Sequence, residues 1–264
     1  MNKKETEEIF HDGWANSIDI LDIMVDEAFE ACSSPENKII LNKLGNVEGK
    51  KILELGCGAG EASVYFAKMG ALVTSTDISK GMLNLADKLA KAHHVLLTTK
   101  QSSSDKIGFE DNSFDIVYAA NLLHHVDIED TIKEVKRVLK PNGIFVGFDP
   151  LAHNTLINIY RKIATDVRTK DEHPLNISDV KIFEKYFSEV TYDVTWFFTL
   201  FIFLKYFFID GVNPNKERYW KKIIIEHEKI KTMHNFLEKL DIVFLKKFPF
   251  LKKYCWNIVF VCRK

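Results

Sequence analysis

The sequence has few of the features that mark secreted, metal-binding or membrane-spanning proteins. Its four cysteines form no CxxC pair and its histidines lack ligand spacing, so neither a disulfide framework nor a metal site is expected. The longest apolar stretch, residues 194–209, has 16 residues and is interrupted by Lys205, whereas a spanning helix needs about 20. The N-terminal MNKKETEEIF lacks the apolar core of a secretory signal. We therefore expect a cytoplasmic protein.

Net charge is also nearly absent, but it is unevenly distributed. The formal charge of −1 gives no reason to expect a nucleic-acid partner. Residues 1–36 nevertheless hold ten acids against two lysines, and residues 214–264 hold thirteen Lys/Arg against five acids. The two ends therefore have different roles, or they face each other across a cleft.

The middle of the chain alternates short apolar segments with amphipathic ones. Strands are predicted at residues 50–56, 71–77, 95–101, 113–121 and 143–149. Helices are predicted between them at residues 61–70, 80–93 and 128–140, the last closed by Pro141-Asn142-Gly143. This alternation is typical of an α/β protein with a parallel, doubly wound sheet.

The flanking segments add helices to this core. A helix is expected over residues 5–31, and a second one through Leu44 with Ser34 as its cap. Past Pro150 the pattern predicts, in order, a helix around 154–166, a helix at 178–187, a strand at 188–196, helical segments over 197–251 and a strand at 254–264. We divide the chain into an N-terminal helical cap (1–45), a core domain (46–196 with 254–264) and a helical lid insertion (197–253).

Glycines and acids stand where a doubly wound fold binds ligands. Glu54-Leu-Gly56-Cys-Gly58-Ala-Gly60 follows the first strand, at the switch point of such a sheet. Asp77 ends the second strand, where a carboxylate can accept hydrogen bonds from two ribose hydroxyls or cap the next helix. The GxGxG spacing differs from the GxGxxG of dinucleotide-binding proteins.

Four blocks together resemble the class I S-adenosylmethionine (SAM)-dependent methyltransferases, in particular their quinone-methylase-like, small-molecule branch. The blocks are ILELGCGAG (52–60), VTSTDIS (73–79), FEDNSFDIVYAANLLHHV (109–126) and EVKRVLKPNGIF (134–145). The resemblance implies a Rossmann-like, seven-stranded sheet whose last strand is antiparallel. It also implies SAM as cofactor, with S-adenosylhomocysteine as product.

The resemblance assigns a cofactor role to several positions. Glu54 should set the glycine loop near the amino-acid end of SAM, and Asp77 should bind the ribose. The remaining expected contacts are Gly56, Gly58 and Gly60 along the cofactor, Ile78 on the adenine, Ser103 or Ser104 near the adenine amino group, and Asn121 beside the methionine portion. For Asn121, a turn residue bonding its own backbone is the alternative interpretation.

Candidate acceptor-side residues follow the fourth and fifth strands. His124, His125, Asp149 and His173 are candidate bases, which an oxygen acceptor needs if its proton is not lost early. Structural packing is the alternative for the first two, and a turn or cap is the alternative for Asp149. We expect further acceptor contacts from the polar cluster Arg168, Asp171, Glu172 and His173. His11 and Trp14 either close over the cofactor or belong to a surface helix.

The insertion is rich in aromatics and lysines. Residues 194–208 contain eight aromatic side chains, and lysines alternate with phenylalanines near residue 250. Either these rings pack the lid against the core, or residues 194–254 contact a membrane surface.

We expect methyl transfer to a small, largely apolar or lipid-like acceptor, with oxygen favoured as the reacting atom. A SAM-binding regulatory module without turnover and a protein or nucleic-acid methyltransferase are the alternatives. Against the last, AANL stands at residues 119–122, where an NPPY-like motif would be expected.

Overall fold

The protein is built on one mixed sheet of seven strands. The computed structural model describes residues 3–163 and 173–264. The strands are β1 (Lys51–Leu55), β2 (Leu72–Asp77), β3 (Thr98–Gln101), β4 (Phe114–Ala120), β5 (Leu139–Pro150), β6 (Glu189–Thr195) and β7 (Asn257–Arg263). Their order is β3-β2-β1-β4-β5-β7-β6, and β7 runs antiparallel to both of its neighbours. The predicted fold class is confirmed.

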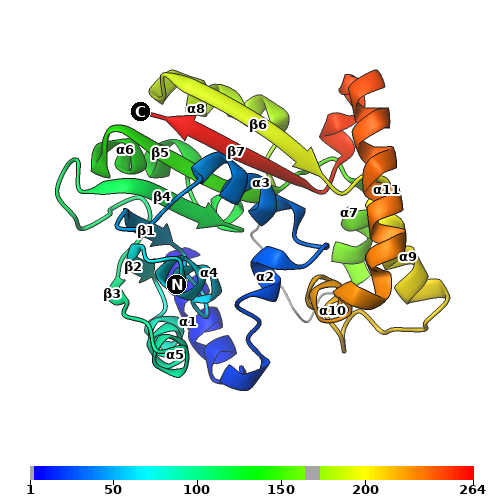
Figure 1. Cartoon of the computed structure of the whole chain (residues 1–264), viewed down its shortest axis with the longest axis horizontal. Helices are drawn as coiled ribbons and strands as arrows, with labels where there is room; N and C mark the ends of the chain where they lie inside the picture. The colour runs from blue at the N-terminus through cyan, green and yellow to red at the C-terminus, as the bar shows by residue number, and fades with distance from the viewer. Residues whose placement is uncertain (1–2, 164–172) are drawn as a thin grey trace.

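Helices cover both faces of this sheet. The α-helices are α1 (Lys3–Ala15), α2 (Glu27–Glu30), α3 (Pro35–Leu44), α4 (Glu61–Lys68), α5 (Lys80–Ala92), α6 (Ile128–Val138), α7 (Thr155–Ile163), α8 (Val180–Tyr186), α9 (Phe201–Phe208), α10 (Tyr219–Ile225) and α11 (His227–Lys247). Short 3₁₀ turns are η1 (Ile20–Asp22), η2 (Leu123–His125), η4 (Ile177–Asp179), η5 (Phe198–Leu200) and η6 (Pro249–Tyr254). Figure 1 shows α7, α9, α10 and α11 together at one side, beyond the ends of β6 and β7.

The strands are buried on both faces, which explains their nearly continuous apolar sequence. Along β1, Leu53 and Leu55 pack with α6 and α8, whereas Ile52 points to the opposite face with α3, α4 and α5. On β4, Val117 lies in the first of these cores and Tyr118 in the second. The sheet therefore has one apolar core on each face, and a ligand can bind only beyond the ends of its strands.

The helix predicted over residues 5–31 is wrong beyond Ala15. Both the backbone amide and the hydroxyl of Ser17 bond to the Trp14 carbonyl, which ends α1. Asp19 then accepts a 3.0 Å hydrogen bond from the Leu21 amide and starts η1. Serine and aspartate compete in this way with helical hydrogen bonding. Downstream, Phe29 of α2 packs in the core.

Two predicted details at other helix ends are also wrong. Ser34 precedes α3, but its hydroxyl donates to the Glu27 carbonyl and makes no capping bond. Pro141-Asn142-Gly143 lies inside β5, because α6 ends at Val138 and the chain is extended from Leu139 onward. The backbone amide of Lys264 bonds to the Gly143 carbonyl, so the last residue of the chain holds this segment beside β7.

The helices between β6 and β7, which we predicted to be a lid, have an apolar core of their own. Trp196, Phe203, Tyr206 and Tyr219 are buried together with aliphatic side chains of α7, α10 and α11. Asp241 links α11 to the segment that follows β6, because its carboxylate accepts backbone hydrogen bonds from three consecutive residues, 197–199. Among the described helices, none is long and apolar enough to cross a membrane.

The acidic N-terminal part packs against this basic lid. The Ser33 hydroxyl donates a 2.8 Å hydrogen bond to the Ile223 carbonyl, and Lys221 Nζ lies 4.0 Å from the Asp22 carboxylate. The two oppositely charged ends of the sequence therefore meet in space.

Candidate active site

The glycine loop between β1 and α4 combines tight packing with an open side. Gly56, Gly58 and Gly60 all have positive φ, between 51° and 92°, a region that favours glycine. A Cβ on Gly60 would lie 2.6 Å from Cβ of Ala86, so this glycine lets α4 and α5 approach each other. A Cβ on Gly58 would meet nothing within 4 Å. Gly58 is therefore the position where the backbone is open to a ligand.

Asp77 at the end of β2 is bound to this loop. Its two carboxylate oxygens accept hydrogen bonds from the backbone amides of Gly58 (3.0 Å) and Ser79 (2.8 Å). Burial raises the pKa of Asp77, and the two amides and nearby His11 oppose that rise. A carboxylate has about four acceptor positions, so Asp77 can accept a further hydrogen bond, as the predicted contact with ribose requires. The capping and ligand-binding interpretations of Asp77 are thus compatible.

Glu54 connects the strands and the helix that flank the glycine loop. It is buried and accepts a hydrogen bond from the Ser63 hydroxyl, and this hydroxyl lies 2.5 Å from Oγ of Ser75. Burial, the largest effect, raises the pKa of Glu54 to about 8. Its carboxyl group is therefore mostly protonated at neutral pH, and it joins β1, β2 and α4 beneath the glycines.

Helix α1 lies across the carboxyl edge of the sheet. Asp12 Oδ1 accepts hydrogen bonds from the Ser79 hydroxyl (2.5 Å) and the Gly81 amide (2.8 Å), at the start of α5. Gln101, at the end of β3, donates to Glu8 of α1 and to the carbonyl of Ile78. The ends of β2 and β3 are therefore covered by the N-terminal helix.

Histidine and carboxylate side chains lie close together at the carboxyl ends of β4 and β5. His124 Nδ1 lies 2.5 Å from Asp149 Oδ1, and Asp149 is fully buried. The same carboxylate accepts backbone hydrogen bonds from Leu122, Leu123 and His124, so it holds η2 as well as the ring. If Nδ1 donates to Asp149, Nε2 of His124 is the nitrogen that can accept a proton.

Glu7 of α1 completes this group and was not among the predicted residues. It is buried, and its oxygens lie 3.5 Å from His11 Nε2 and 3.5 Å from His125 Nδ1. Burial lowers the pKa of both histidines, and Glu7 opposes that effect. The rings of His125 and His124 are 4.0 Å apart. The i,i+4 spacing of Glu7 and His11 was the one sequence signal for this contact.

The other predicted residues lie at the same edge or outside the described residues. Ser103 bonds to Asp105, and Ser104 Oγ is 3.1 Å from Thr131 Oγ1, which holds their loop to α6. Asn121 is exposed with φ of 52°, and the His173 amide donates to the His124 carbonyl. Arg168, Asp171 and Glu172 lie outside the described residues.

Similarity to known proteins agrees with this geometry. Residues 53–147 match the family model described as a methyltransferase domain. The chain contains a class I SAM-dependent methyltransferase domain. The chain is 28% identical over 169 residues to a sterol 24-C-methyltransferase of Gibberella zeae, covering 62% of this chain and 41% of the relative. It is 34% identical over 116 residues to a ubiquinone biosynthesis O-methyltransferase of Pasteurella multocida, covering 40% and 48%.

Solved structures show the same fold. The Haemonchus contortus phosphoethanolamine N-methyltransferase 2 in complex with SAM has a TM-score of 0.57 at 20% identity, covering 87% of this chain and 52% of that one. The YcgJ protein of Bacillus subtilis has a TM-score of 0.53 at 18% identity, covering 86% and 96%. The chain spans about half or less of the length of the curated relatives that it matches.

The residues of this methyltransferase domain fit SAM, the cofactor of the family. The open backbone at Gly58 leaves room for the amino-acid portion, and Asp77 keeps acceptor positions for the ribose hydroxyls. A carboxylate acceptor beside open backbone therefore suits the ribose of a nucleoside.

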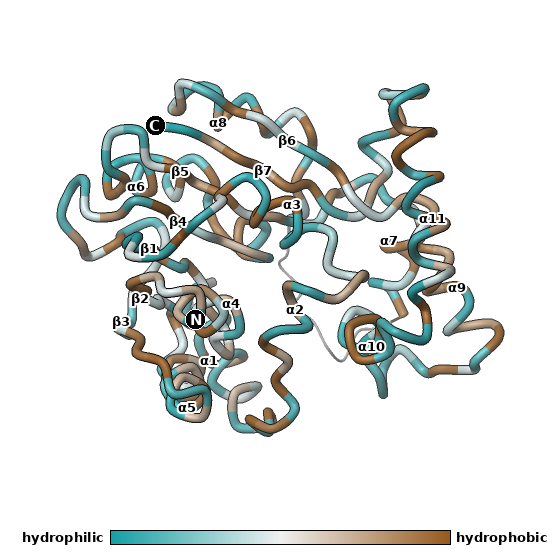
Figure 2. Tube along the Cα trace, in the orientation of Figure 1, coloured by the Kyte–Doolittle hydropathy of each residue, from teal (hydrophilic) through white to brown (hydrophobic). Residues whose placement is uncertain are grey.

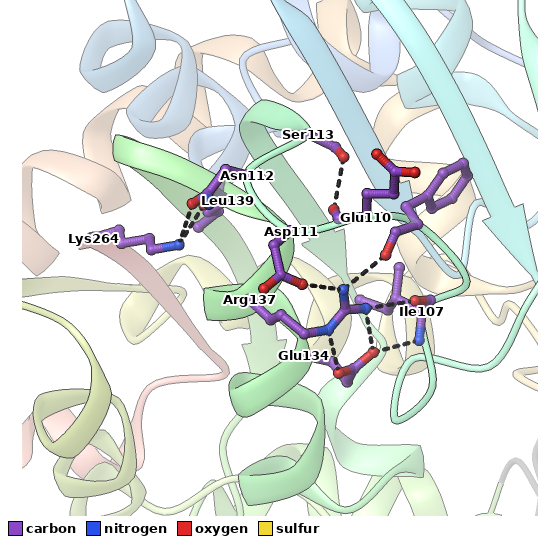
Figure 3. A network of polar contacts seen from close by, with 10 residues as sticks. Ile107, Glu110, Asp111, Asn112, Ser113, Glu134, Arg137, Leu139 and Lys264 are labelled. Carbon is purple, nitrogen blue, oxygen red and sulfur yellow. Dashed lines mark hydrogen bonds and ion pairs between the residues drawn. The ribbon is translucent and has the colours of Figure 1, made fainter.

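Parts of two of the four resembling blocks have a structural role: Phe109 and Asp111 in one, and Glu134 and Arg137 in the other. Arg137 of α6 bonds to the carboxylates of Glu134 and Asp111 and to the carbonyls of Ile107 and Phe109 (Figure 3). One guanidinium thus fixes the loop that leads into β4. This network lies at the amino ends of the strands, away from the glycine loop.

Proposed function

We propose that this chain transfers the methyl group of SAM to an oxygen atom of a small, largely apolar or lipid-like acceptor. The observation that carries the proposal is the His124–Asp149 pair at the carboxyl edge of the sheet. Buried and held by three backbone amides, Asp149 orients the ring of His124. An oriented imidazole suits an acceptor whose hydroxyl proton must be removed during the reaction.

The residues of this chain would bind SAM, orient the acceptor and remove its proton. SAM, when bound, supplies an electrophilic methyl group on a sulfonium. Gly58 and Asp77 would hold that donor, and α1 would exclude water from it. Holding the acceptor in line with the methyl group can supply about 7–11 kcal/mol of the barrier. His124 Nε2 would take the proton, and Glu7 would hold the neighbouring ring of His125 in place.

A lipid-like acceptor is supported by the apolar surface of the lid. Five phenylalanines form a continuous row, which we call the phenylalanine row: Phe201, Phe198, Phe244, Phe248 and Phe250, with neighbouring ring centroids 4.8–6.2 Å apart. Its two ends are exposed, by 51% and 69% respectively. Figure 2 shows apolar residues along α9 and apolar residues mixed with polar ones along α11.

Lysines lie beside this row. Lys246, Lys247, Lys252 and Lys253 flank Phe248 and Phe250 in sequence, and Lys247 Nζ is 5.5 Å from the Phe248 ring centroid. Aromatic rings among lysines suit the interface of an anionic membrane. We therefore propose peripheral membrane contact through the lid. Similarity to a sterol methyltransferase supports an acceptor that resides in such a surface.

The test is product formation with acceptors of defined chemistry. The chain is incubated with SAM and with phenols, quinols or long-chain alcohols, and S-adenosylhomocysteine is measured between pH 5 and 9. His124→Gln should lower turnover by about 10²–10⁴-fold, because it removes the proposed base. The exposed His153 gives the matched control His153→Gln. Binding of SAM without turnover on any acceptor would favour the regulatory module.

A further inference from the structure

Arg218, immediately before α10, differs from the other arginines that the structure describes. Arg137 and Arg263 pair with carboxylates, and Arg161 bonds to the side chain of Asn158. Within residues 3–163 and 173–264, the guanidinium of Arg218 has no hydrogen bond or ion pair to a carboxylate; its contacts are aromatic. Among the described residues, no carboxylate therefore supplies a counter-charge to this cation.

The environment of Arg218 is partly buried and aromatic. The side chain is partly buried, with Cζ 4.3 Å from the ring centroid of Trp14 and 5.9 Å from that of Trp220. Burial lowers the pKa of Arg218, and Tyr160 opposes this effect. Stacking on tryptophan uses the face of the guanidinium and leaves its N–H donors, which lie in the guanidinium plane, available to a ligand.

Arg218 also lies beside the candidate active site. The ring of Trp14 is 5.8 Å from that of His11, and the ring of His11 is 6.2 Å from that of His125. His11 interacts electrostatically with Asp77, the expected ribose ligand. The guanidinium therefore lies where α1 meets the helices between β6 and β7, and the rings of Trp14 and His11 connect it to the edge at which His125 lies.

We propose that Arg218 binds an oxyanion on the acceptor, a carboxylate or a phosphate. A planar guanidinium can bind either group through two parallel hydrogen bonds. The acceptor is then an anionic amphiphile, with its apolar body against the aromatic lid and its charged group at Arg218. This inference rests on the proposed function for the identity of the ligand as an acceptor, but the anion site can be tested without turnover.

The experiment is calorimetric titration of the S-adenosylhomocysteine-saturated chain with octanoate, octyl phosphate and octanol. The three probes share one apolar chain, and only the first two carry an oxyanion. The variants are Arg218→Gln, Arg218→Lys and the control Lys253→Gln, which removes an exposed lysine from the lid surface. Melting temperature and S-adenosylhomocysteine affinity report whether each variant is folded.

The proposal predicts that the wild type binds at least one anionic probe at least tenfold more tightly than octanol. Arg218→Gln should remove that preference and leave octanol binding unchanged, whereas Lys253→Gln should preserve it. Arg218→Lys keeps the charge and the stacking, so it should retain part of the preference. A preference for octanoate identifies the group as a carboxylate, and a preference for octyl phosphate identifies it as a phosphate.

Other results would overturn it. Equal binding of all three probes by the wild type would exclude an oxyanion site. A loss of octanol and anion binding in equal measure in Arg218→Gln, or an unchanged preference in a folded variant, would leave Arg218 as a structural contact between α1 and the lid. An anion preference at Arg218 without methyl transfer to any acceptor would contradict the proposed function and not this site.

Discussion

The backbone amide of Gly58 donates a 3.0 Å hydrogen bond to the carboxylate of Asp77. This bond joins the open position of the glycine loop to the end of the neighbouring strand, 19 residues further along the chain. The two features that identify the cofactor site in the sequence are therefore one structural unit. Changes at either residue should alter ligand binding more than folding.

Removing the Asp77 carboxylate should weaken cofactor binding. Each hydrogen bond to a charged group contributes about 1.5–3 kcal/mol, so Asp77→Ala should bind SAM and S-adenosylhomocysteine at least tenfold more weakly in calorimetric titration. Asp87→Ala is the control, because Asp87 is another carboxylate nearby that bonds to Thr99 on β3. Unchanged affinity in a folded Asp77→Ala protein would exclude Asp77 as the ribose ligand.

Two glycines of the same loop should respond differently to alanine. Gly60→Ala places a methyl group against Ala86 and should destabilise the fold, by about 1–3 kcal/mol for overpacking alone. Gly58→Ala has open space and should cost about 1–2 kcal/mol for its left-handed backbone. The Gly58 variant should fold and lose cofactor affinity by tenfold or more. Urea unfolding and calorimetry separate the two effects, and equal affinity in Gly58→Ala would refute the assignment.

Stability should depend on pH through Glu54. Its pKa rises from 4.5 to about 8 on folding, so between these values the folded state binds one proton more than the unfolded state. Its contribution is fully present below pH 4.5 and is lost as pH rises through 8, with a slope of up to about 1.4 kcal/mol per pH unit. Glu54→Gln should therefore lose less stability than the wild type between pH 6 and pH 8 in urea unfolding. Parallel pH profiles would show that Glu54 is ionised in the fold.

Membrane contact should depend on the ends of the phenylalanine row. Vesicles of phosphatidylcholine with phosphatidylglycerol should sediment the wild type, and vesicles of phosphatidylcholine alone should sediment less of it. Phe201→Ser and Phe250→Ser should each reduce binding about tenfold, from the loss of about 1.5–3 kcal/mol of apolar transfer. Leu96, exposed by 92% outside the lid, provides the control Leu96→Ser. If neither phenylalanine variant sediments less than the wild type, the aromatic side chains of the lid pack against the protein and do not contact the membrane.

The fold could be predicted because its strands and helices have clear local patterns. Buried strands such as β1 read as apolar runs, and α6 has its apolar residues at helical spacing. The helix over residues 5–31 failed where Ser17 and Asp19 bond to nearby backbone, since apolar periodicity alone carries no information on such competition. Two local hydrogen bonds therefore determine where this helix ends, and the helix propensity of the segment does not.

The candidate site could be predicted only where it is local in sequence. Gly58 and Asp77 belong to motifs of known spacing, whereas Glu7 enters the site because α1 lies across the sheet edge. The pairing of Arg218 with Trp14 joins residues that are more than 200 positions apart. Such contacts depend on how helices pack, which the spacing of motifs does not specify.

The contact of Asp12 with the start of α5 has a kinetic consequence. If SAM binds beside Asp77 as proposed, donor entry and product exit would require the bonds of Asp12 to Ser79 and Gly81 to break, because α1 lies over the ends of β2 and β3. The lifetime of this closed arrangement would then limit how fast one nucleoside replaces another. In that regime the N-terminal helix, far from the transferred methyl group in sequence, sets the turnover of the whole cycle.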